Sequence, residues 1–141
     1  MIDALSILVL VVSHFVADFL LQSRGMATQK SKSWRVLFEH GSINMFVVFL
    51  GMLLLSGGHF SRDAATTALV ISGINAVVHM AIDKTLWLLY AVSVIVRTPE
   101  IPRHKLEKDW KYWEDWWFYT FLGFDQLLHV ATLILLYNFL R

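Results

Sequence analysis

The sequence predicts an all-α integral membrane protein, a four-helix bundle built by a single transmembrane domain, residues 1–141. Two observations predict this fold class. The chain is 57% hydrophobic and only 16% charged, whereas about a quarter of the residues in average soluble domains are charged. Its apolar residues also gather in four long runs, and about 20 mostly apolar residues are enough for a helix to cross a bilayer.

The first run, Ile2 to Gln22, predicts the first spanning helix. It lacks the basic start and the small-residue cleavage site of a signal peptide, so we expect it to be retained. Ser33 is a suitable N-cap for the second helix, which we expect from Trp34 to about Ser56. The polar linker between these helices carries three basic residues, Arg24, Lys30 and Lys32.

The third run is longer than a single span. It begins near Ala64, and after Asp83 and Lys84 it continues as the apolar piece Thr85–Val96. One helix over this length would measure about 50 Å at 1.5 Å per residue, whereas the bilayer core is about 30 Å thick. We therefore expect Thr85–Val96 to form one extra interfacial helix that bends away, or to protrude from the bundle.

The last run predicts a helix from about Trp116 to Leu140, after the polar stretch Arg97 to Glu114. An aromatic cluster precedes and opens this helix, as is typical of membrane interfaces. Its members are Trp110, Tyr112, Trp113, Trp116 and Trp117.

Basic residues concentrate in the first and third linkers, which four spans would place on the same side of the membrane. The positive-inside rule then predicts that both linkers are cytoplasmic and both termini lie outside. The net charge of +1 lacks the basic excess of nucleic-acid-binding proteins, so we expect no such partner. The absence of cysteine excludes disulfides and thiolate metal ligands.

Three pairs of polar residues interrupt the apolar runs, each with its members four residues apart and therefore on one helix face. They are His14 and Asp18, His79 and Asp83, and Asp125 and His129. Gln22 extends the first pair by the same spacing, and the second helix contributes His40 with Asn44. In the predicted topology all these groups lie at similar depth in the cytoplasmic leaflet, where they can face one another.

The cost of burying charge indicates what these groups bind. An Asp in the middle of a membrane costs about 2.5–3.5 kcal/mol on the insertion scale, and three carboxylates facing one another would repel. A divalent cation would offset their charge. Imidazole and carboxylate together suit Zn, Mn or Fe, and the number of donors allows one ion or two.

The candidate metal ligands are therefore the members of the three pairs, His14, Asp18, His79, Asp83, Asp125 and His129. A carboxylate that is not bound to the metal can act as general base, so the candidate catalytic residues are Asp18, Asp83 and Asp125. Gln22, His40 and Lys30 are candidate substrate-binding residues.

Three functions are compatible with this pattern. The first is a metal-dependent hydrolase that acts on an anionic, lipid-linked or amphiphilic substrate from the cytoplasmic leaflet. The second is a transporter or channel for a metal ion or a proton, because His/Asp chains also form relays. The third is a non-catalytic interaction protein, such as a homo-oligomer, in which the polar groups hold helices together.

The strings HFVADFLLQ, RGMATQK with the following LFEH, HMAID and FDQLLH occur in this order. Together they resemble the family of small bacterial and phage membrane proteins called domain of unknown function 3307. The resemblance covers nearly the whole chain and implies a multi-pass protein of the bacterial inner membrane. It points to the same His and Asp residues and adds Gln126 as a substrate-binding candidate.

Overall fold

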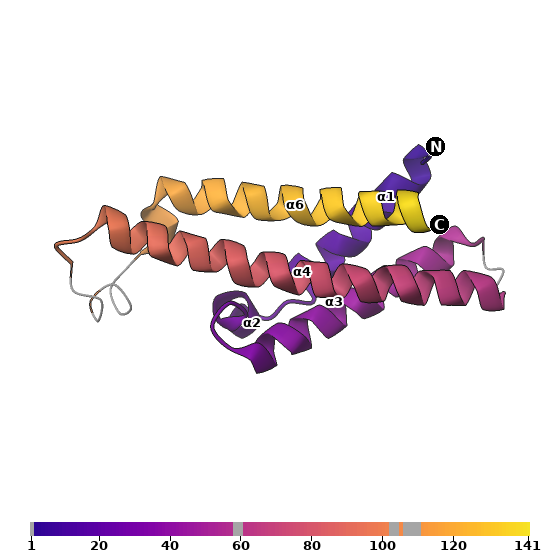
Figure 1. The fold of residues 1–141 in the computed structure, drawn as a ribbon, viewed down its shortest axis with the longest axis horizontal. Coiled ribbons are helices and arrows are strands. Elements are labelled where there is room, and N and C mark those ends of the chain that lie inside the picture. Colours follow the sequence, from indigo (N-terminus) through magenta and orange to yellow (C-terminus); the bar gives the residue numbers. More distant parts are fainter. Residues whose placement is uncertain (1, 58–60, 102–104, 106–110) are drawn as a thin grey trace.

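The computed structural model describes residues 2–57, 61–101, 105 and 111–141. The chain is all-α and 85% helical, and the described ranges contain no strand, which confirms the predicted class. In chain order the elements are α1 (Ala4–Phe15), the π-helical turn η1 (Val16–Leu20), α2 (Arg24–Gln29), α3 (Trp34–Leu55), α4 (Arg62–Arg97), the 3-10 turn η2 (Tyr112–Glu114) and α6 (Trp116–Leu140) (Figure 1).

Three helices, α3, α4 and α6, are long and apolar enough to cross a membrane. The first predicted span, Ile2 to Gln22, is shorter in the structure: the apolar helix covers Ala4–Leu20 and falls below that length. It begins at Ala4 because Asp3 is its N-cap and accepts a hydrogen bond from the backbone N–H of Ser6 at 2.8 Å.

The end of this first helix has π-helical rather than α-helical geometry. The backbone N–H of Leu21 donates to the carbonyl of Val16, five residues earlier, at 2.9 Å. Such wide turns are rare and often occur at functional sites. The turn η1 contains Asp18, which is buried. The apolar pattern predicts an ordinary helix here because it does not distinguish one wide turn from a regular one.

Helix α4 is continuous over 36 residues, a length of about 54 Å. The prediction that Thr85–Val96 bends away is therefore wrong, and the protruding alternative is correct. The piece contains neither Pro nor Gly, the residues at which helices usually break. With the start of α6 it forms a helical hairpin that extends well beyond α2 and the beginning of α3 (Figure 1).

An ion pair closes the far end of this hairpin. Arg97 contacts Asp115 at 2.9 Å, and Tyr90 donates to the same carboxylate at 3.0 Å. The hydrogen bond from Arg97 holds the pKa of Asp115 below its usual value. Of the predicted aromatic cluster, Trp113, Trp116 and Trp117 are exposed, Tyr112 packs against Phe118, and Trp110 lies outside the described residues.

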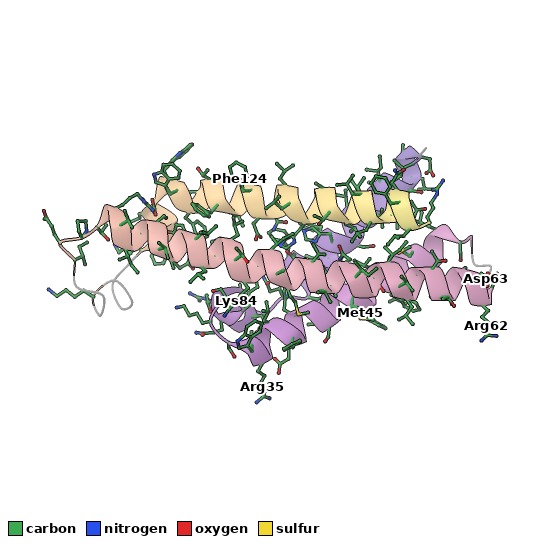
Figure 2. The ribbon with its side chains drawn as sticks, in the orientation of Figure 1. Arg35, Met45, Arg62, Asp63, Lys84 and Phe124 are labelled. Atoms are coloured by element: carbon green, nitrogen blue, oxygen red, sulfur yellow. The ribbon has the colours of Figure 1, made fainter. Side chains whose placement is uncertain are left out.

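The first linker contains the short helix α2, which the sequence pattern did not predict because one and a half turns show no periodicity. Ser23 caps it by accepting from the backbone N–H of Met26 at 3.2 Å. Lys84 of α4 fixes the end of the linker, since it donates to the carbonyl of Ser31 at 2.5 Å and lies over the ring of Trp34 (Figure 2). Ser33 is the N-cap residue of α3, as predicted, but its side chain makes no capping hydrogen bond.

Helix α4 packs against α3 and α6, and α1 packs against both α3 and α6. Their apolar core lies toward the end of the molecule at which both termini and the α3–α4 connection are found (Figure 1). Its most deeply buried members are 0–1% exposed: Leu10, Val48, Ile71 and Leu133. Close approach of α3 to α1 depends on Gly51, because a Cβ there would clash with the Oγ of Ser13 and lie 3.2 Å from its Cβ.

We expect Gly51→Ala to lower the stability of the protein in detergent. Overpacking costs about 1–3 kcal/mol, which exceeds the roughly 0.5–1 kcal/mol that Ala gains over Gly within a helix. Thermal unfolding followed by circular dichroism measures the change. Gly123→Ala is the matched control, since a Cβ there meets nothing within 4 Å and should leave stability equal or higher. Equal unfolding temperatures for the wild type and Gly51→Ala would contradict the close packing.

A candidate metal centre in a buried His/Asp cluster

The three predicted pairs are all in contact within their own helices. The imidazole Nε2 and carboxylate oxygen are separated by 3.7 Å in the α1–η1 pair, 3.4 Å in the α4 pair and 3.5 Å in the α6 pair. All of these side chains are at most 3% exposed. The structure brings the pairs together in the interior: His14 and Asp18, His79 and Asp83, and Asp125 and His129.

The tightest part of this cluster is a quartet of donor atoms from three helical segments: Asp18 of η1, His40 of α3, and His79 and Asp83 of α4. The two imidazole Nε2 atoms are 2.9 Å apart. Each lies close to Asp18 Oδ1, at 3.3 Å from His40 and 3.2 Å from His79. Each also lies 3.4 Å from Asp83 Oδ2.

These separations match the edges of a metal coordination shell. Four ligands at about 2.0–2.1 Å from a tetrahedral ion lie about 3.3–3.4 Å from one another. The imidazole–imidazole separation and the four imidazole–carboxylate separations of the quartet span 2.9–3.4 Å. His40, which sequence reasoning assigned to substrate binding, is thus one of the best-placed metal donors. Two imidazoles and two carboxylates fit Zn, Mn or Fe.

The carboxylates of the cluster lack the hydrogen bonds that buried oxygens normally make. Among the described residues, Asp18 Oδ1, Asp83 Oδ2 and Asp125 Oδ1 are buried without a well-formed hydrogen bond, and their neighbours are imidazole Nε2 atoms at 3.2–3.5 Å. Leaving a buried carboxylate oxygen unpaired is costly because it has lost its hydration. A cation bound among these oxygens would remove that cost, so the donor set fits a metal ion.

Lys30 also reaches into the cluster, although it follows α2 in the linker. Its Nζ lies 2.7 Å from Asp83 Oδ1 and 3.4 Å from His40 Nε2. Of the Lys and Arg side chains that the structure describes, only Lys30 is buried, at 5% exposure. With neutral imidazoles, three carboxylates and one ammonium leave a net charge of −2, which one divalent cation neutralises.

Amide side chains surround the cluster. Gln126 joins two of its members, because its Oε1 lies 3.2 Å from His14 Nε2 and its Nε2 donates to Asp125 Oδ2 at 3.1 Å. Asn75 donates to Asn44 at 2.9 Å, one turn away from the quartet. The Oε1 of Gln22 is buried without a hydrogen-bond partner, so no hydrogen bond of that atom ties it to the cluster.

Comparisons with known proteins give a family but no function. The family model described as "Protein of unknown function (DUF3307)" matches residues 6–141. No curated protein and no solved structure matches the chain.

We expect Lys30→Met to lower the free energy of unfolding by about 3–5 kcal/mol when chelator is present, because it leaves Asp83 as an uncompensated buried charge. Denaturant unfolding in detergent measures the loss. Combining it with Asp83→Asn should recover part of the loss, since the second change removes the unpaired charge.

The exposed pair Arg35–Glu39 on α3 is the matched control, with side chains 88% and 47% exposed. Arg35→Met should change stability by less than about 1 kcal/mol. Equal effects of Lys30→Met and Arg35→Met would show that the Lys30–Asp83 contact is not a buried ion pair.

Proposed function

The chain belongs to the DUF3307 family, and we propose that it is a metal-dependent membrane hydrolase. The observation that carries the proposal is the quartet of Asp18, His40, His79 and Asp83, in which each imidazole Nε2 lies 3.2–3.4 Å from an oxygen of both carboxylates. Further His and Asp side chains border the quartet, which a purely structural ion would not need. These additional groups provide what hydrolysis requires besides the metal.

A divalent cation bound in the cluster would act as a Lewis acid and lower the pKa of bound water toward 7. The residues of the cluster would hold that ion and handle the protons. Asp125 is the best-placed general base, because Gln126 fixes its Oδ2 at 3.1 Å while its Oδ1 is buried without a hydrogen-bond partner. Lys30 adds a positive charge next to Asp83.

The proposed reaction is the addition of water across an ester or phosphoester bond. Asp125 takes a proton from water as the water oxygen forms a bond to the electrophilic carbon or phosphorus. The bond to the leaving oxygen breaks, and that oxygen keeps the electron pair. The proton held by Asp125 then passes to the leaving oxygen, so the carboxylate is regenerated.

An amphiphilic substrate suits the surroundings of the cluster. The outer faces of the helices beside it are apolar and exposed, as shown by Val77, Phe124 and Leu127 at 63%, 55% and 61% exposure. The polar linker with its exposed basic residues lies next to the cluster through Lys30. We propose that the chain is a multi-pass protein of the bacterial inner membrane, with the basic linkers in the cytoplasm and the substrate approaching from that leaflet.

The other two functions receive less support. A transporter needs a polar path across the bundle, but Leu10, Val48, Ile71 and Leu133 form a buried apolar layer toward the end that holds the termini. Polar groups that only hold helices together would satisfy one another's hydrogen bonds, whereas several carboxylate oxygens here make no well-formed hydrogen bond and face imidazole Nε2 atoms at 3.2–3.5 Å.

We expect the purified protein to contain a divalent metal, measured by inductively coupled plasma mass spectrometry, and His79→Ala to lose it. Chelation followed by metal return should restore the content of the wild type but not of the variant. Circular dichroism at each step separates loss of metal from loss of fold. No metal above trace, with no difference between wild type and His79→Ala, would contradict the centre.

We expect hydrolysis of amphiphilic p-nitrophenyl esters or phosphodiesters in detergent micelles to be sensitive to chelator. Asp125→Asn should lower the rate by about 10²–10⁴-fold, the usual contribution of a general base, while metal content stays unchanged. Asp63→Asn, which replaces an exposed carboxylate at the start of α4, is the control and should keep the wild-type rate. Equal rates for the two variants would remove Asp125 from the reaction.

A further inference from the structure

Three members of the cluster remain after the quartet is assigned: His14, Asp125 and His129. His129 Nε2 lies 3.5 Å from Asp125 Oδ1, and both atoms are buried without a hydrogen-bond partner. Each of these side chains is at most 3% exposed. Asp18 joins this set as well as the quartet, since donor atoms of Asp18, Asp125 and His129 lie within 4.8 Å of one another.

Two carboxylates face both sets of donors. Asp18 presents Oδ1 to His40 and His79, while its Oδ2 lies 3.7 Å from His14 Nε2. Asp83 presents Oδ2 to the quartet, while its Oδ1, which Lys30 contacts at 2.7 Å, also lies 3.5 Å from His129 Nε2. Carboxylates that offer one oxygen to each side can bridge neighbouring cations, which two-metal sites hold about 3.5–4 Å apart.

The coordination number gives a separate argument. Four protein donors fill a tetrahedral ion, and catalytic centres keep a position open for water or substrate. The quartet already provides four protein donors. The second set, which consists of His14, Asp125 and His129, has fewer protein donors of its own. An ion there would keep a coordination position open for an exogenous ligand, next to the proposed base Asp125.

We propose, on the basis of the proposed function, that the cluster holds two divalent cations and that the second binds together with a phosphoryl group. The first ion brings the charge of the three carboxylates and Lys30 from −2 to zero. A second ion would leave +2 in a buried site, which is unfavourable without a counter-ion. A phosphate monoester or phosphate, with close to two negative charges, restores neutrality, so the substrate class is a phosphoryl compound.

The test is the metal stoichiometry with and without phosphate. The full-length protein in detergent is stripped with chelator, returned to buffer and dialysed to equilibrium against Mn²⁺, with or without millimolar inorganic phosphate. We expect one equivalent of bound Mn²⁺ per protein without phosphate and two with it. The sample with phosphate should also show the electron paramagnetic resonance spectrum of a spin-coupled Mn²⁺ pair. His129→Ala, which removes a donor of the second set, should stay at one equivalent under both conditions, and Asp63→Asn should behave as the wild type.

A second arm identifies the source of the phosphoryl group. Micelles that contain phosphatidic acid replace inorganic phosphate, with phosphatidylcholine as the control lipid. If the second equivalent of Mn²⁺ binds at a lower total phosphorus concentration with phosphatidic acid than with inorganic phosphate, the phosphoryl group belongs to a lipid. The reverse order assigns a soluble phosphate, and both results support the coupled second cation.

Other outcomes overturn the inference. One equivalent regardless of phosphate leaves the single-metal hydrolase standing but removes the second cation. Two equivalents without phosphate remove the coupling to a phosphoryl group. No bound Mn²⁺, together with no Zn²⁺ or Fe²⁺ in the same dialysis, removes the metal centre itself and with it the proposed function.

Discussion

Three carboxylates, Asp18, Asp83 and Asp125, lie buried between helices whose outer faces are almost entirely apolar. Each loses its hydration there, and that loss has to be offset by charge of the opposite sign. The arrangement of the helices follows from this requirement: η1, α3, α4 and α6 all direct polar side chains to one point in the interior. The main apolar core lies toward the end that holds the termini.

The linker between the first two apolar helices takes part in this compensation. Lys30 supplies the buried positive charge of the cluster, while Lys84 of α4 holds the same linker through the carbonyl of Ser31. The linker is thus attached to α4 at two points. The side chain of Lys30 contacts Asp83 of α4, and the backbone carbonyl of Ser31 accepts a hydrogen bond from Lys84 of α4. Any rearrangement of the linker that admits a substrate must therefore disturb the electrostatics of the cluster.

Sequence spacing predicted much of this centre, because two residues four apart on a helix must share a face. It correctly paired His14 with Asp18, His79 with Asp83 and Asp125 with His129. It assigned His40 to substrate binding rather than to the metal, because distances between helices depend on packing that a local sequence pattern does not contain. It assigned Lys30 to substrate binding and did not predict its contact with Asp83, because that contact depends on the tertiary position of the linker. It left open whether Thr85–Val96 bends or protrudes, because apolar periodicity continues through either arrangement.

Because η1 is a π-helical turn, the number of residues between His14 and Gln22 is tightly constrained. A wide turn holds one residue more than the regular helix would need to cover the same path, and Asp18 lies within it. Removing Val16 or Ala17 would restore regular geometry and change the position of Asp18 around the helix relative to His14. Substitutions on the outer face of this segment are compatible with the fold, whereas insertions and deletions before Asp18 would turn it away from the three imidazoles that it contacts. During divergence of the family, this turn should therefore vary in composition but not in length.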